Sequence, residues 1–117
     1  MNSIPTAPDQ VSTVELFSRL AATIEDRRNA DPEQSYVAKL IGGGTEVIAK
    51  KVGEEAIETV LAAVSEDQDA VLRESADLVF HLMVLWANRG ITLGDVATEL
   101  ARREGVSGLE EKNGRRN

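Results

Sequence analysis

Apolar residues recur at helical spacing near the start of the chain, beginning just after Ser12. Glu15 stands three residues beyond Ser12, and such a pair is typical of a capping box at the start of a helix. The apolar positions that follow at helical spacing are Val14, Phe17, Leu20, Ala21 and Ile24. This spacing predicts a helix over residues 13–28.

The middle of the chain continues the helical periodicity on both sides of a run of glycines. A short helix is predicted over residues 36–41, with Ser35 as its cap and Gly42–Gly44 as its end. A longer helix is predicted over residues 45–64, with Thr45 as its cap. Gly53 lies inside this longer helix and costs about 1 kcal/mol relative to alanine, which a packed helix tolerates.

The second half of the chain predicts two more helices. Ser65 with Gln68 fits a capping box, and the largely apolar helix that follows runs to Gly90, a residue typical of helix ends. The last helix begins at Thr92 or Leu93 and reaches about Glu104. No stretch alternates as a strand does, so the sequence predicts an all-α fold of four to five helices.

The helices carry more apolar surface than a lone chain of 117 residues easily covers. We therefore predict a helical bundle that is completed by homodimerisation. The periodicity places one domain over residues 12–104, between a flexible leader at 1–11 and a C-terminal tail at 105–117.

Composition narrows the classes of protein that fit. The net charge of −7 opposes binding to nucleic acid through its phosphates, and no run of apolar residues is long enough for a membrane span. The absence of cysteine excludes disulfides, thiolate metal sites and a cysteine nucleophile, and it suits a reducing cytoplasm.

Three glutamates, Glu54, Glu55 and Glu58, crowd one arc of the predicted helix over residues 45–64. Like charges three and four residues apart repel each other, so the cluster weakens the isolated helix. One interpretation is an ordinary solvated face of an amphipathic helix. The other is a site whose function requires the acids.

The next helix adds a second acidic pair, Glu74 and Asp77, one turn apart, with His81 one turn further on. An antiparallel arrangement of the two helices would bring both groups of acids to one groove. Their carboxylates outnumber the basic residues that are suitably placed, so a bound divalent cation is favoured. Ligation entirely by oxygen favours Mg²⁺, with Mn²⁺ as the alternative.

The pattern EExxE followed by ExxD resembles that of the all-α nucleoside triphosphate pyrophosphohydrolases, which include MazG-type enzymes and dimeric dUTPases. Within this superfamily the flanking residues are similar to the phosphoribosyl-ATP pyrophosphohydrolase family of histidine biosynthesis. The stretches that carry the likeness are "SYVAKL" at 35–40, "KKVGEEAIE" at 50–58, "ESADLVFHLMVL" at 74–85 and the closing "SGLEEK". The likeness covers about residues 13–112.

The resemblance implies an enzyme that hydrolyses the α–β phosphoanhydride of phosphoribosyl-ATP to phosphoribosyl-AMP and pyrophosphate. It also implies a homodimer and a set of metal ligands: Glu55, Glu58, Glu74 and Asp77. Glu54 is the remaining candidate to orient or deprotonate the attacking water, with completion of a second metal shell as its alternative role.

Other residues are candidates for contact with substrate. Lys51 either binds phosphate or pairs with the neighbouring acids, and Lys39 is a further phosphate candidate beside the alternative of a plain surface charge. Tyr36 can stack on a base or pack in the fold. His81 is a candidate general base, but the favoured interpretation is a hydrogen-bonded structural histidine that supports an acidic ligand. Further candidates of the same kinds are Trp86, Arg102, Arg103, Arg115 and Arg116.

Two other functions fit the same residues. A housekeeping pyrophosphohydrolase of the superfamily, acting on ordinary nucleoside or deoxynucleoside triphosphates, differs only in substrate. A non-catalytic helical dimer with solvated acids differs because Mg²⁺ should not alter its stability.

Overall fold

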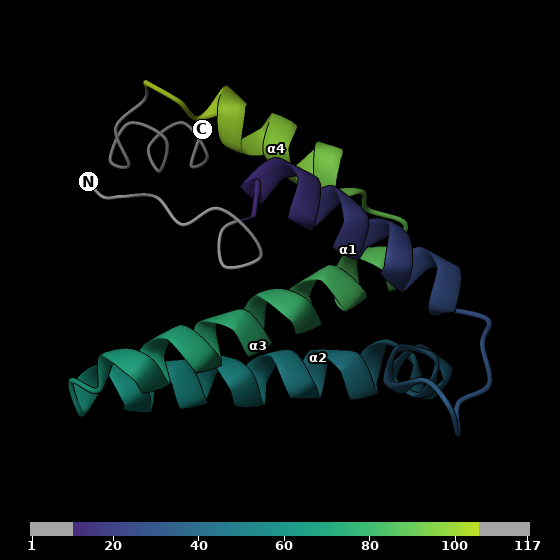
Figure 1. Cartoon of the computed structure of the whole chain (residues 1–117), viewed down its shortest axis with the longest axis horizontal. Coiled ribbons are helices and arrows are strands. Elements are labelled where there is room, and N and C mark those ends of the chain that lie inside the picture. Colours follow the sequence, from purple (N-terminus) through teal and green to yellow (C-terminus); the bar gives the residue numbers. More distant parts are fainter. Residues whose placement is uncertain (1–10, 106–117) are drawn as a thin grey trace, which may run out of the picture.

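The computed structural model describes residues 11–105, and these form four α-helices (Figure 1). The helices are α1 (Thr13–Arg27), α2 (Tyr36–Val64), α3 (Gln68–Asn88) and α4 (Leu93–Arg102). This confirms the predicted all-α class. The predicted leader at 1–11 and tail at 105–117, with Arg115 and Arg116, lie almost wholly outside the described residues.

Local capping fixes the start of each helix. Ser12 Oγ accepts a hydrogen bond from the Glu15 amide in α1, and Ser35 Oγ accepts one from Ala38 in α2. In α4, Thr92 and Asp95 exchange hydrogen bonds as a complete capping box. Each of these hydroxyls satisfies an amide that the first turn of a helix leaves without a partner.

The predicted Ser65–Gln68 capping box is wrong. Ser65 ends α2 and its hydroxyl donates to the Ala62 carbonyl, whereas Asp67 caps α3 by accepting from the Ala70 amide. Glu66, between them, has a positive φ of 60°, which turns the chain back in three residues. The turn therefore uses the serine for the end of one helix and the aspartate for the start of the next.

Gly42–Gly44 bend a helix where the sequence predicted a boundary between two. α2 is continuous from Tyr36 to Val64 except at Gly44, whose φ of 86° and ψ of 177° are not helical. Figure 1 shows the first turns of α2 end on and the rest of the helix along the page. The kink directs the first segment of α2 toward α3, where Tyr36 contacts Phe80 and His81.

The long arm of α2 packs along α3, and the two helices form an antiparallel hairpin (Figure 1). α1 crosses the C-terminal end of α3, and the core lies where these three helices meet. Its buried apolar residues are Ile24, Val37, Leu40, Ile48, Met83 and Val84. No residue of α4 is buried among the described residues.

Side chains from α1 and α2 hold the C-terminal end of α3. Arg28 Nη1 donates to the Ala87 carbonyl at 3.0 Å, and Thr45 Oγ1 donates to Asn88 Oδ1 at 2.8 Å. Gly90 follows with a φ of 75°, as predicted for the residue after the helix. These contacts fix α3 relative to the end of α1 and to the part of α2 that follows the kink.

In the described part of the chain, no helix is long and apolar enough to cross a bilayer.

Candidate functional site

Three carboxylates meet where the long arm of α2 faces α3. Glu55 comes from α2, and Glu74 and Asp77 come from successive turns of α3, with one oxygen of each within 4.8 Å of the others. Residues at i and i+3 share one side of a helix, so α3 presents its two acids together. Glu55 and Glu74 are half-buried and Asp77 is exposed. We call this group the acidic triad.

The triad carries negative charge that the described chain does not neutralise with an ion pair. Burial raises the pKa of Glu74, and Glu55 and then Asp77 raise it further, while Arg73 lowers it. Across residues 11–105, none of the three carboxylates forms an ion pair with a lysine or arginine. Three converging oxygen ligands without a cationic partner fit a hard divalent cation such as Mg²⁺.

The remaining predicted acids on α2 lie outside the triad. Glu58 is exposed and is not part of the group whose oxygens converge within 4.8 Å. Glu54 is also exposed, and its Oε1 lies 3.3 Å from Lys51 Nζ. Of the two roles considered for Lys51, pairing with an acid is the one this structure contains.

Lys51 remains charged in this setting. Its hydrogen bond to Glu54 raises the pKa of the ammonium, and the nearby Tyr36 and Glu55 act in the same direction. The side chain is about one-third exposed, at 36%, so a phosphate from solvent can reach it. Lys51 therefore stands as a cation between Glu54 and the first turn of α2.

Tyr36 and His81 connect the kinked segment of α2 to the triad. The Tyr36 hydroxyl lies 2.9 Å from His81 Nε2, and His81 Nδ1 lies 2.7 Å from the backbone oxygen of Asp77. The histidine thus supports the helical turn that carries Asp77 through its carbonyl. The contact between His81 and Tyr36 was not predicted from the sequence, because it depends on the direction of the kink at Gly44.

Lys39 is exposed and lines an open cavity of about 710 Å³ at the start of α2. Tyr36 lines the same cavity, so this hollow begins beside the Tyr36–His81 contact. The other lining residues are Pro32, Glu33, Gln34 and Ser35. Both predicted substrate contacts on this segment therefore face one solvent-accessible space.

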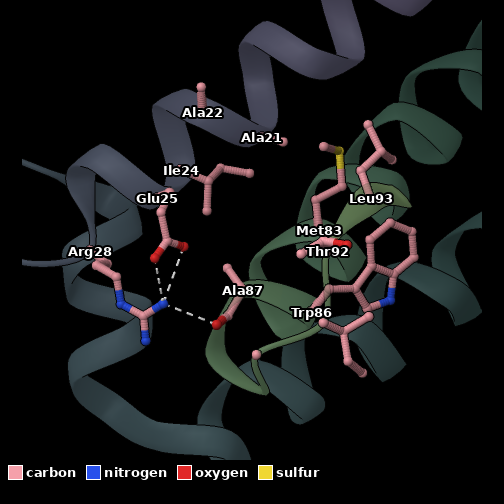
Figure 2. Close-up of a pocket in the computed structure, with 12 residues that line it drawn as sticks. Ala21, Ala22, Ile24, Glu25, Arg28, Met83, Trp86, Ala87, Thr92 and Leu93 are labelled. Carbon is pink, nitrogen blue, oxygen red and sulfur yellow. Dashed lines mark hydrogen bonds and ion pairs between the residues drawn. The ribbon is translucent and has the colours of Figure 1, made fainter. Parts of the chain in front are cut away.

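A second cavity, of about 410 Å³, lies between α1 and the end of α3 (Figure 2). Most of its wall is apolar, and in Figure 2 Glu25 and Arg28 point toward each other across 3.1 Å. Trp86 belongs to this cavity, more than two helical turns beyond Asp77 along α3. That placement separates Trp86 from the triad.

The two arginines at the end of α4 both pair with one acid. Arg102 Nη2 lies 2.7 Å and Arg103 Nε 2.9 Å from Glu99 Oε2. Their hydrogen bonds lower the pKa of Glu99 to about 2. Their suggested contact with phosphate stays a prediction.

Comparison with known proteins identifies relatives over nearly the whole chain. A phosphoribosyl-ATP pyrophosphohydrolase family model matches residues 17–104. A phosphoribosyl-ATP pyrophosphatase from Azospirillum brasilense is 54% identical over 110 residues, covering 94% of this chain and 98% of the relative. Proteins of the same name from Rhodospirillum rubrum and Erythrobacter litoralis are 48% identical over 116 residues and 56% identical over 96. These two alignments cover 99% and 82% of this chain, and 99% and 92% of the respective relatives. The chain belongs to the phosphoribosyl-ATP pyrophosphohydrolase family.

Proposed function

We propose that this protein hydrolyses the α–β phosphoanhydride of phosphoribosyl-ATP and releases phosphoribosyl-AMP and pyrophosphate, a step of histidine biosynthesis. The observation that carries the proposal is the acidic triad of Glu55, Glu74 and Asp77, which converges without an ion pair to a lysine or arginine within the described residues 11–105. Membership of the family supports the choice of substrate. A cytoplasmic location suits this role.

In this proposal the triad binds Mg²⁺, with Mn²⁺ as a substitute, and Glu58 adds a ligand from the next turn of α2. A divalent ion there would lower the pKa of a bound water and offset charge on the departing pyrophosphate. The like charges on Glu55 and Glu74 raise the pKa of Glu74 in the absence of a cation. Cation binding would relieve that repulsion.

Lys51 and Glu54 supply the chain's own acid–base and phosphate-binding groups. Because Lys51 is charged and partly exposed, a substrate phosphate competes with Glu54 for its ammonium. As Lys51 turns to the phosphate, the carboxylate of Glu54 becomes available to orient and deprotonate the attacking water. Lys39, on the kinked segment, binds a more distant phosphate of the substrate.

We further propose that the protein is a homodimer joined through the free end of the α2–α3 hairpin. Figure 1 shows that neither α1 nor α4 lies along this end. Large apolar side chains are exposed there: Ile57, Val60, Leu61, Val64 and Leu72. A contiguous apolar surface on a small protein is typical of an interface.

The decisive experiment measures pyrophosphate release from phosphoribosyl-ATP and from ordinary nucleoside triphosphates, with Mg²⁺ and with EDTA. Asp77→Asn removes a triad carboxylate, and Glu46→Gln is the matched control because Glu46 is an exposed acid of α2 outside the triad. We expect Asp77→Asn to lose about 100-fold or more in turnover, since residues that merely support metal ligands cost about 10- to 100-fold. The control should retain activity.

Turnover of ordinary triphosphates at comparable rates would assign the protein to the housekeeping role. Absence of pyrophosphate release from every substrate would contradict catalysis and leave the triad as a charged surface.

A further inference from the structure

His81 uses both ring nitrogens inside the fold. The side chain is only 5% exposed, although it stands next to the acidic triad. Nδ1 lies 2.7 Å from the Asp77 carbonyl, and Nε2 lies 2.9 Å from the Tyr36 hydroxyl. The imidazole is therefore a bridge between α3 and the first residue of α2.

The chemistry of these partners sets the direction of the hydrogen bonds. A backbone carbonyl can only accept, so Nδ1 must carry a proton and donate it to Asp77. In an uncharged ring, Nε2 then has a lone pair and accepts the proton of the Tyr36 hydroxyl. The tyrosine has no second proton to offer to any other group.

The ring of Tyr36 is held in place as well as its hydroxyl. Its ring stacks on Phe80 with centroids 6.2 Å apart and an interplanar angle of 16°. His81 meets the edge of the same ring, with centroids 5.7 Å apart. Tyr36 nevertheless remains 49% exposed, on the wall of the cavity shared with Lys39. Tyr36 is thus held in position by Phe80 and His81 while about half of the residue stays exposed.

An oxygen of this kind discriminates among the parts of a nucleotide. It can accept a hydrogen bond from a sugar hydroxyl or a base amino group, whereas an ionised phosphate oxygen offers only lone pairs and would be repelled. Lys51, close enough for Tyr36 to raise its pKa, is the donor available to phosphate nearby. Tyr36 therefore suits a part of the substrate that carries hydrogen-bond donors, and Lys51 suits a phosphate.

We propose that Tyr36 is a specificity-determining residue whose oxygen accepts a hydrogen bond from a hydroxyl or amino group of the nucleotide, and that His81 is the residue that positions it. This inference rests on the proposed pyrophosphohydrolase function and adds the part of the substrate that Tyr36 recognises.

The first test asks which atoms donate in the hydrogen bonds of His81 to Tyr36 and Asp77, and it uses neither substrate nor metal. Ring ¹⁵N and ¹H NMR of His81 in the wild-type protein should show a protonated Nδ1 and an unprotonated Nε2. In Tyr36→Phe, which keeps the ring on Phe80, the Nε2 resonance should shift because its donor is gone. A proton on Nε2 at neutral pH would overturn the proposal, since the tyrosine would then be the acceptor and its own proton would face the substrate.

Steady-state kinetics test whether Tyr36 recognises the nucleotide. We expect Tyr36→Phe to raise KM for phosphoribosyl-ATP roughly 3- to 10-fold, the effect of one neutral hydrogen bond, with kcat within about twofold of wild type. Thr45→Val is the matched control because it removes another α2–α3 hydroxyl contact, Thr45 to Asn88, away from the triad. The control should leave KM unchanged. An unchanged KM in Tyr36→Phe overturns the specificity role.

Two substitutions of the histidine separate its nitrogens. His81→Asn keeps a donor near the Asp77 carbonyl and loses the acceptor for Tyr36, so it should raise KM as Tyr36→Phe does. His81→Gln places an amide oxygen near the tyrosine and should raise KM less. The double variant Tyr36→Phe with His81→Asn should be no worse than either alone, and additive effects would contradict positioning through Tyr36.

Failure of this proposal is distinct from failure of the proposed function. Wild-type protein that releases no pyrophosphate overturns the function, and the specificity role with it. Wild-type turnover with an unchanged KM in Tyr36→Phe overturns only the role of Tyr36. Thermal stabilisation by Mg²⁺ should be the same in Tyr36→Phe and wild type, because the triad is intact in both.

Discussion

At the scale of single residues, the raised pKa of Glu74 reflects burial and electrostatic repulsion within the acidic triad. Burial and the adjacent Glu55 raise its pKa, so the folded protein favours the protonated carboxyl. The stability associated with that raised pKa is present at low pH and is lost as the pH rises through it. Ionising Glu74 beside Glu55 and Asp77 is therefore a source of repulsion that a bound cation would relieve.

Removing one carboxylate of the triad should weaken metal binding without destabilising the metal-free protein. We expect Asp77→Asn to cost little in EDTA, or to stabilise, because it relieves repulsion on Glu74. Wild type should gain about 2.7 kcal/mol of unfolding free energy at an Mg²⁺ concentration of about 100 times Kd, and Asp77→Asn should gain almost none. Thermal unfolding with and without Mg²⁺ measures this, with Glu46→Gln as the control that should respond like wild type.

The pKa of Glu99 is shifted in the opposite direction from that of Glu74. Arg102 and Arg103 lower its pKa from 4.5 to about 2, so the ionised form is favoured in the folded protein. Its contribution to stability is present above about pH 4.5 and is lost as the pH falls toward 2. Glu99→Gln should therefore be less stable than wild type near neutral pH and equal to it at the acid end. Helicity followed by circular dichroism across this range measures the difference, and a gap that widens on acidification would contradict the assignment.

At the scale of helices, the sequence predicts where a helix begins better than it predicts the direction in which the helix runs. Ser12 and Ser35 cap helices as expected, because a capping hydroxyl interacts with amides only three residues away. Gly44 shows the limit. The direction of its bend brings Tyr36 to His81, a contact between residues that are 45 apart along the chain. The acid pairs were predictable from their i, i+3 spacing, but the exclusion of Glu58 from the triad depends on how α2 is rotated against α3.

Gly42 and Gly44 have different roles, which alanine substitutions should separate. Gly44→Ala places a side chain at a φ of 86° and ψ of 177°, a region essentially confined to glycine, and should cost about 1–3 kcal/mol. Gly42→Ala meets no atom within 4 Å in a helical segment and should stabilise by about 0.4–1 kcal/mol. Urea unfolding of both variants provides the comparison. Equal effects would contradict a conformational requirement at Gly44.

At the scale of the whole molecule, the described chain leaves the far end of the α2–α3 hairpin uncovered. The core lies at the opposite end, where α1 and the first segment of α2 meet α3. Val64 and Leu72, at the hairpin tip, are 76% and 70% exposed. Glu55 and Glu74 lie on the same pair of helices, so an interface here would also fix the two helices that carry the triad. Assembly and metal binding would then stabilise the same part of the molecule.

A charge placed in this apolar surface should prevent assembly without unfolding the protomer. Val60 is 59% exposed, so Val60→Glu is tolerated by a single chain but buries a carboxylate in the proposed dimer. We expect its dimer dissociation constant to rise by about 100-fold or more, the loss typical of an interface hot spot. Val14→Glu is the matched control, because Val14 is 75% exposed on α1, away from the hairpin. Sedimentation equilibrium over a range of concentrations measures the constants, and circular dichroism confirms folding. A monomeric wild type, or a Val60→Glu variant that dimerises as tightly as the control, would contradict assembly through this surface.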